Sequence, residues 1–417
     1  MFVPFIQYLA FALLSIRGAE CTGLQTTPSF NLRPFSIDLS NRVPTMLSKI
    51  NETQLPDLPE YPGVGSSFGI NLDTLKSFQQ EWLTSFNWEK EQSSINQFNH
   101  FEATIENLTI HFIHEKSKCP NAIPLLLLHG WPSSFLEFVP LINQLVQRAN
   151  ISYGKSVSFN IIVPSLPGFA FSSPPPANWT VVDTARVFNT LMTDVLGYST
   201  FAVHGTDFGV GPAYVLYDQY NKTTRAAHLV FLPFFPLTPT ELQALNITLS
   251  PLEEFEEQRF IEWDTFGLGY FLEQSTKPNT LGLALYDNPI GQLAWIGEKY
   301  INGSDPRAGT GGSLLNSNEI LLSVSLYYLS QCFVSSVYIY AQNPGGFSTN
   351  YTKARTDAPL LFSAFKYNIG FWPPALVAKV GNLVSYRNHY VGGHFPALEN
   401  PSALIADLRE IGTYWTD

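Results

Sequence analysis

A regular alternation of short apolar runs with amphipathic helical segments constrains this chain more than any other feature. Ile123–Leu128 is a continuous apolar run, the pattern of a strand buried on both faces, and Phe159–Val163 is expected to be a second buried strand. Between them, Phe138–Gln147 has apolar residues at helical spacing. Strands that alternate with helices form a largely parallel sheet covered by helices on both faces. The sequence therefore predicts an α/β fold with a doubly wound, mostly parallel sheet.

The same rhythm continues to the end of the chain, with one long interruption. Residues 233–342 contain no clear strand and are rich in helix-forming and aromatic residues, which predicts a helical insertion. Near the N-terminus, 72–86 has helical spacing and 105–114 alternates like a strand, so this region leads into the sheet. The remaining expected elements are helices at 183–196, 210–220 and 401–411 and strands at 201–204, 227–232, 360–365 and 383–386.

Composition narrows the class of partner. Hydrophobic residues make up 45% of the chain and charged residues only 14%, which gives ample apolar surface for a core and argues against disorder. The formal net charge is −11, without clusters of Lys and Arg. Nucleic acids and anionic membrane surfaces both need such clusters. We therefore expect a small molecule as partner and no nucleic acid.

The chain begins with an apolar run that ends before Arg17 and is followed by Gly18 and Ala19. The run is shorter than the roughly 20 residues needed to cross a bilayer, which favours a cleaved secretory signal over residues 1–19. Because no basic segment precedes the run, an uncleaved anchor in the endoplasmic reticulum membrane is the alternative. N-x-S/T sequons agree with a secreted or secretory-pathway glycoprotein. They begin at Asn51, Asn107, Asn150, Asn178, Asn221, Asn246, Asn302 and Asn350.

Cysteine usage leaves two alternatives open. Cys21 lies beside the expected cleavage point, and Cys119 and Cys332 are the only other cysteines. In an oxidising compartment these two could form one disulfide, and two buried free thiols fit the sequence equally well.

The first candidate for chemistry is Gly205-Thr206-Asp207-Phe208-Gly209, between an expected strand and an expected helix. A tight, strained turn after a strand requires small residues around its reactive side chain. That side chain is Asp207 here, and a carboxylate can attack saturated carbon to give an ester that water later cleaves. The alternative is a surface aspartate that caps the following helix.

Two further segments could complete such a site. The turn His129-Gly130-Trp131 follows a buried strand and could present the backbone N–H groups of Trp131 and Phe208 to the ester oxyanion. An ordinary strand-terminating turn is the alternative. Gly392-Gly393-His394 follows the last expected strand, and a histidine late in the chain suits a general base. Otherwise His394 would be a solvated loop histidine.

Together these motifs resemble a known family. His-Gly-Trp-Pro-Ser-Ser-Phe at 129–135, Pro-Ser-Leu-Pro-Gly-Phe at 164–169 and Gly-His-Phe-Pro-Ala-Leu-Glu at 393–399 are similar to motifs of microsomal-type epoxide hydrolases, fungal members included. The likeness runs from about Pro34 to the C-terminus. It implies an α/β-hydrolase fold with a helical lid and an N-terminal extension that wraps the core. The expected bounds are 30–118 for the extension, 119–232 and 346–417 for the core, and 233–345 for the helical cap.

The resemblance also implies a reaction that needs no cofactor. An epoxide would be opened to a vicinal diol through an ester on Asp207, which water activated by His394 would hydrolyse. Tyr270 and Tyr340 match two lid tyrosines that bind the epoxide oxygen, and phenol O–H groups can donate to the alkoxide formed on ring opening. Tyr338 is the close competitor of Tyr340.

Three departures from the family pattern matter. Thr206 and Phe208 replace a usual Gly or Ser and Trp, and Ser133 stands where Gly is common. More seriously, the third catalytic acid falls on Asn368 in an ungapped alignment. An acid there orients the histidine and stabilises the imidazolium, whereas Asn supplies no charge and could favour the wrong tautomer by donating. We hypothesise that alkylation of the nucleophile survives and that hydrolysis is slowed.

Other interpretations stay open. A haloalkane dehalogenase would use the same aspartate and histidine, with Trp131 among its halide donors. A non-catalytic member with Asn368 would bind an apolar ligand, and a biosynthetic enzyme would open one specific epoxide by intramolecular attack. In each case the partner is a small apolar molecule, and a homodimer is left open. Nothing suggests a metal, since the chain has no HExxH motif and His129, His204 and His228 fit strand ends.

Overall fold

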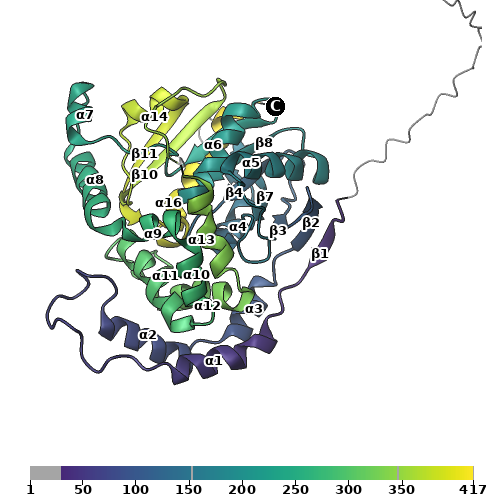
Figure 1. The fold of residues 1–417 in the computed structure, drawn as a ribbon. Helices are drawn as coiled ribbons and strands as arrows, with labels where there is room; N and C mark the ends of the chain where they lie inside the picture. The colour runs from purple at the N-terminus through teal and green to yellow at the C-terminus, as the bar shows by residue number, and fades with distance from the viewer. Residues whose placement is uncertain (1–29, 152–153, 345–346, 417) are drawn as a thin grey trace, which may run out of the picture.

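The computed structural model describes residues 30–151, 154–344 and 347–416, and the expected signal at 1–19 and Cys21 lie outside them. Within this part of the chain, nine strands form one sheet in the order β1-β2-β3-β7-β4-β8-β9-β10-β11, and β5 and β6 form a separate small pair (Figure 1). The strands are β1 (Arg33–Phe35), β2 (His100–Ile105), β3 (Leu108–Glu115), β4 (Ile123–Leu128), β5 (Ala149–Asn150), β6 (Ser156–Val157), β7 (Phe159–Pro164), β8 (Phe201–Gly205), β9 (Thr224–Leu229), β10 (Pro359–Tyr367) and β11 (Asn382–Gly393).

The part of the sheet from β7 to β11 is parallel, which confirms the predicted α/β fold. Its strands β4 and β7 consist almost wholly of buried residues, as their continuous apolar runs indicated. Two expected bounds were wrong. β9 ends three residues early at Leu229, and β11 continues to Gly393, so the glycines before His394 belong to the strand end.

Helices cover both faces of the sheet. Gly205 approaches α6 so closely that a Cβ on it would lie 2.9 Å from Ala213, while the preceding His204 faces the opposite side, toward α16. In the core the helices are η2 (Phe135–Phe138), α4 (Val139–Leu145), α5 (Val181–Thr190), η4 (Leu191–Val195), η5 (Asp207–Gly209), α6 (Val210–Gln219), α14 (Pro374–Val380), α15 (Pro396–Glu399) and α16 (Pro401–Tyr414).

One expectation for the N-terminal region was wrong. The strand expected over 105–114 is interrupted at Glu106 and Asn107, which form a two-residue turn between β2 and β3. Both residues have positive φ, 50° and 66°, as a tight hairpin turn of the primed type requires. The period-2 alternation missed this turn because it contains no glycine. Through β1, β2 and β3 the region extends the parallel sheet with antiparallel strands.

Helices alone lie between β9 and β10 in the described residues, with one isolated bridge joining Phe234 to Ser348. These helices form a lid over the carboxyl ends of the parallel strands (Figure 1). They are α7 (Pro239–Ala244), α8 (Pro251–Glu262), η6 (Trp263–Gly267), α9 (Gly269–Thr276), α10 (Pro278–Leu285), α11 (Pro289–Gly303), α12 (Ser317–Ser330) and α13 (Phe333–Gln342).

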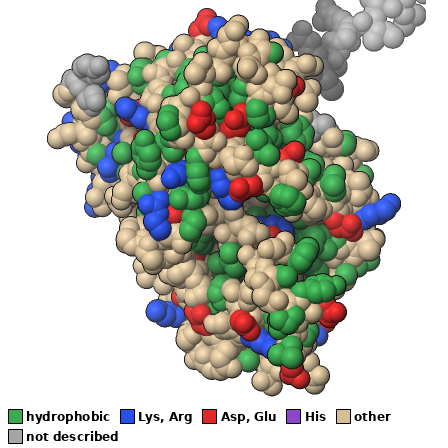
Figure 2. All heavy atoms as spheres, turned by 90° about the vertical axis from the view of Figure 1, so that its left-hand side faces the viewer, with side chains coloured by type: hydrophobic (Ala, Val, Ile, Leu, Met, Phe, Trp, Pro, Cys, Tyr) green, Lys and Arg blue, Asp and Glu red, His purple; other side chains and the backbone are tan. Residues whose placement is uncertain are grey.

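The lid also rests on the N-terminal region. The helices η1 (Ser40–Arg42), α1 (Val43–Glu52), α2 (Leu72–Thr84) and α3 (Trp88–Ile95) run beneath α11 and α12 (Figure 1). In the described part of the chain, no single helix is long and apolar enough to cross a membrane, and α12 and α13 meet that test only as a pair bent by 94°. On the face that carries α7 and α8, charges of both signs are scattered among apolar side chains (Figure 2).

Candidate active site

Asp207 lies at the sharp turn between β8 and α6. Its φ of 42° is in the left-handed region, a strained conformation for a non-glycine residue and one expected of a nucleophile on such a turn. The turn is tight because a Cβ on Gly209 would lie 2.1 Å from the carbonyl oxygen of Leu128. Only 8% of Asp207 is exposed, and its side chain does not cap the helix. The alternative of a surface helix cap was therefore wrong.

The turn after β4 holds one oxygen of this carboxylate. The backbone N–H of Trp131 donates to Oδ1 of Asp207 over 2.8 Å. A side chain at Gly130 would collide here, since its Cβ would lie 2.1 Å from that Oδ1 and 2.6 Å from the amide nitrogen of Phe208. The geometry thus explains the glycine and places an N–H donor where an ester oxyanion would form. A donor role for the Phe208 amide remains a prediction.

His394 faces the other oxygen of Asp207. Its Nε2 lies 3.2 Å from Oδ2, and its Nδ1 lies 2.8 Å from Oδ1 of Asn368. The Asn368 amide cannot be reversed, because its Nδ2 donates to Val230 O over 3.0 Å and its Oδ1 accepts from the amide N–H of Ile369 over 2.8 Å. Asn368 therefore accepts from Nδ1–H and leaves Nε2 free to act as a base. The wrong tautomer considered from the sequence does not occur.

The loop that carries His394 is held by a buried carboxyl group. Glu399 accepts from the amide of Phe395 over 2.9 Å and from the amide of Asp305 over 2.6 Å, and the amide of His394 donates to Gly303 O over 2.8 Å. Burial raises the pKa of Glu399 to about 7. The sequence placed Glu399 in a motif without a role, and the structure gives it one, which is to fix the histidine loop against α11.

The two lid tyrosines meet above Asp207. Tyr270 comes from α9 and Tyr340 from α13, and their ring centroids lie 5.9 Å apart. Both are buried, and burial together with the charge of Asp207 raises both phenol pKa values, which keeps them protonated donors. The Tyr340 hydroxyl interacts with that of Tyr270 and has no other hydrogen-bond partner within the described residues. Tyr338 points elsewhere, since its hydroxyl donates to Asn279 over 3.1 Å at the surface.

An aromatic cavity adjoins these groups. Its free volume is only about 20 Å³, so a substrate enters only if aromatic side chains move. The sequence indicated an aromatic-rich lid but did not identify these residues, because aromatic residues are also common core fillers. The lining consists of Asp207, Phe208, Phe231, Phe234, Phe235, Pro236, Phe260, Trp263, Tyr270, Phe271, Tyr340, Phe347, Ile369 and Gly370.

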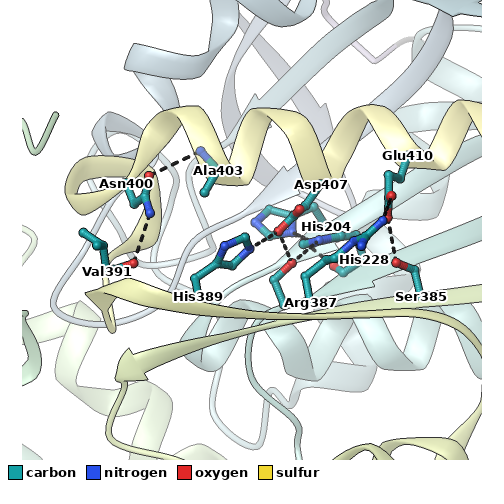
Figure 3. Close-up of polar contacts among 11 residues, drawn as sticks. His204, His228, Ser385, Arg387, His389, Val391, Asn400, Ala403, Asp407 and Glu410 are labelled. Atoms are coloured by element: carbon teal, nitrogen blue, oxygen red, sulfur yellow. Dashed lines mark hydrogen bonds and ion pairs between the residues drawn. The ribbon is translucent and has the colours of Figure 1, made fainter. Parts of the chain in front are cut away.

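Three further histidines form a separate network, and both described cysteines are free. The rings of His204 and His228 are hydrogen-bonded over 2.9 Å, His228 contacts Ser363 over 3.0 Å, and Ser363 donates to Asp407 on α16 over 2.6 Å (Figure 3). His389 joins this network by contacting Asp407 over 2.6 Å. In the described residues no group of three or more His, Cys, Asp or Glu could hold a metal ion. Cys119 and Cys332 are free, so they form no disulfide with each other.

Comparisons with known proteins agree with this geometry. Residues 32–138 match the family model described as epoxide hydrolase N terminus, and residues 123–278 match the model of the alpha/beta hydrolase fold. Epoxide hydrolase 1 of Sus scrofa is 31% identical, over 91% of this chain and 88% of the relative. The structure of Aspergillus niger epoxide hydrolase has a TM-score of 0.80 at 32% identity, covering 93% of this chain and 97% of that one. Juvenile hormone epoxide hydrolase of Bombyx mori has a TM-score of 0.81 at 26% identity, covering 93% and 95%.

Proposed function

The chain belongs to the epoxide hydrolase family and acts on epoxides, and on this premise we propose that Asp207 is alkylated and His394 directs hydrolysis. In the first step Oδ2 of Asp207 attacks an epoxide carbon while its Oδ1 stays on the Trp131 amide. The carbon–oxygen bond breaks, and the alkoxide takes a proton from Tyr270 or Tyr340. The observation that carries this proposal is the placement of both phenols opposite the nucleophile.

In the second step water attacks the ester carbonyl carbon of Asp207. Nε2 of His394 takes a proton from this water, and the Trp131 amide stabilises the oxyanion on Oδ1. The ester bond then breaks, and the leaving oxygen takes the proton of the imidazolium to complete the diol. The new carboxylic acid of Asp207 gives its proton to the phenolate, which restores the carboxylate, the neutral phenol and the neutral imidazole. The oxygen of Oδ2 leaves in the diol and the oxygen of water replaces it on Asp207, while the two protons of water balance the diol, so no cofactor is needed.

Asn368 sets the relative rates of the two steps. It fixes the useful tautomer of His394 through its amide oxygen but offers no negative charge to the imidazolium. Alkylation does not depend on that charge, whereas deprotonation of water is slower without it. We therefore expect the alkyl-enzyme ester to accumulate during turnover.

The substrate is an apolar epoxide. Phenylalanines from β9 onward and from the lid line the cavity, among them Phe231, Phe271 and Phe347. Such walls bind hydrocarbon or aryl substituents and leave the polar contacts to Asp207 and the phenols. A haloalkane dehalogenase is less well supported, because two phenols lie where the leaving group departs.

The test is the intact mass of the protein during turnover of styrene oxide, with diol followed in parallel. The wild type is expected to carry one adduct on Asp207 and to release diol over many turnovers. Asp207→Asn should form neither adduct nor diol, and His394→Gln should keep the adduct without releasing diol. An adduct that forms equally well in Asp207→Asn would overturn the assignment of the nucleophile.

We also propose that the protein enters the secretory pathway and is glycosylated. The asparagines of all eight sequons are exposed in the structure, as acceptors for glycans must be. Expression in a eukaryotic secretion host followed by glycosidase treatment should lower the mass by several glycans. An unchanged mass would count against this localisation.

A further inference from the structure

A second cavity adjoins Tyr270. It has a free volume of about 30 Å³, room for a water molecule, and it is lined by polar groups that the aromatic cavity lacks. Among them are Glu298 and Lys299 of α11, and His394. Tyr270 lines both cavities, with Asp207 in the lining of the first and Lys299 in that of the second.

Lys299 is placed between two aromatic faces. Its Nζ lies 4.9 Å from the ring centroid of Tyr270 and 5.0 Å from that of Trp295. Only 15% of the side chain is exposed, so water screens the charge poorly. A lysine that only extended along the surface toward solvent would not be enclosed in this way. Glu298, its neighbour on α11, forms an ion pair with it.

We propose that Lys299 is a positioning residue that acts through Tyr270, stabilising the negative charge that this phenol acquires when it protonates the epoxide oxygen. The inference rests on the proposed function, in which Tyr270 is a proton donor. When Tyr270 gives its proton to the alkoxide, the phenolate ring carries negative charge directly beneath the ammonium group. The attraction between cation and ring is therefore stronger in the transition state than before it, as catalysis requires.

The need for such a cation follows from the site itself. Burial and the nearby Asp207 raise the pKa of Tyr270. The raised pKa keeps the phenol protonated, but it makes transfer of the proton to the alkoxide less favourable. Lys299 offsets this effect, because its ammonium group lies over the ring. Trp131, which stacks on Tyr270 at 5.4 Å, supplies no charge.

The position of Lys299 should give the pH profile of the alkylation rate an alkaline limb, that is, a decline of the rate at high pH. Burial lowers the pKa of Lys299 to about 8, and the titratable groups that line the same cavity are Glu298, Tyr270 and His394. Below this pH the ammonium is charged, and above it the stabilisation of the phenolate is lost. Alkylation should therefore slow as the pH rises through about 8.

The experiment measures the rate constants of alkylation and of ester hydrolysis from pH 6 to 10, by rapid quench and intact mass with styrene oxide. Lys299→Met should slow alkylation about tenfold at pH 7 and remove the alkaline limb. Lys299→Arg should restore most of the rate and move the limb to higher pH, because the guanidinium keeps its charge. Lys277→Met is the matched control. Lys277 is an exposed lysine of the lid, so its substitution should change neither the alkylation rate nor the alkaline limb.

An equal loss of alkylation rate in Lys299→Met and Lys299→Arg would overturn the inference. An unchanged alkaline limb in Lys299→Met would also overturn it. If Lys299→Met does not fold, Glu298→Gln decides, because loss of the carboxylate should move the limb to lower pH. A limb that stays in place in that variant contradicts the proposal. Tyr270→Phe distinguishes a failure of the proposed function from a failure of the role given to Lys299. Unchanged alkylation in Tyr270→Phe refutes the proposed donor, whereas slowed alkylation there with normal Lys299→Met refutes the role of Lys299 alone.

Discussion

At the scale of single residues, Asn368 has the largest consequence. We expect Asn368→Asp to speed ester hydrolysis about tenfold or more, because an adjacent carboxylate stabilises the imidazolium that forms when His394 deprotonates water. The alkylation rate should not change. The measurement is the single-turnover decay of the adduct, and an unaltered decay would contradict the account given of Asn368.

The same substitution should weaken folding. In the wild type Nδ2 of Asn368 donates to the carbonyl of Val230 over 3.0 Å, and a carboxylate would set two acceptors against each other there. We expect a loss of about 1–3 kcal/mol in the free energy of unfolding. Asn368→Ala is the control, since it removes the side-chain contacts with Val230, Ile369 and His394 and should slow hydrolysis instead.

Most of the site could be predicted from residue types in sequence order, but not its geometry. Asp207, His394 and the Trp131 turn each follow a strand, and parallel strands bring their carboxyl ends to one edge of the sheet. The orientation of the Asn368 amide could not be predicted, because it depends on Val230, 138 positions away in the chain. Lys299 was missed for the same reason, since only packing brings it over Tyr270.

At the scale of elements, the N-terminal helices hold the lid. Nε1 of the buried Trp82 on α2 donates to Ser325 Oγ on α12 over 3.0 Å, and Arg42 donates to Leu329 O over 2.7 Å. Trp82→Ala should therefore cost about 3–5 kcal/mol and make the lid cleavable by protease in the native state. Trp82→Phe keeps the packing and should lose only about 1 kcal/mol.

Limited proteolysis and urea unfolding of both variants check this. Cleavage confined to the loop before α2 in Trp82→Ala would show that the extension and lid are not coupled. The sequence predicted the helix at α2 from its apolar spacing, but not its partner. The spacing shows which face of a helix is buried and does not show which helix covers it.

At the scale of the whole molecule, stability should fall on both sides of neutral pH. Burial lowers the pKa of His129 to about 4 and of His204 to about 3. Their contribution is complete above the unfolded value near 6.5 and is lost as the pH falls toward the folded values. Burial raises the pKa of Glu137 to about 8 and of Glu256 to about 7, so their contribution is complete below about 4.5 and is lost as the pH rises through 7 to 8. As the pH falls from 6.5 to 4.5, the gain from the two carboxyl groups offsets the loss from the histidines. Below pH 4.5 the carboxyl groups give no further gain, so the free energy of unfolding should decline steeply.

Glu137 makes the alkaline side testable. Its carboxyl is buried beneath the nucleophile turn, 3.5 Å from Thr206 Oγ1, with Oε1 lacking a partner in the described residues. Glu137→Gln imitates the protonated form, so its gain in stability over the wild type should be larger at pH 9 than at pH 6, by on the order of 2 kcal/mol. Urea unfolding at pH 6, 7.5 and 9 measures the difference. Glu241→Gln is the control, because that exposed carboxyl is held by Thr238 with a lowered pKa and should give no gain at alkaline pH. An equal gain in both variants would mean that overall charge, and not the burial of Glu137, sets the alkaline decline.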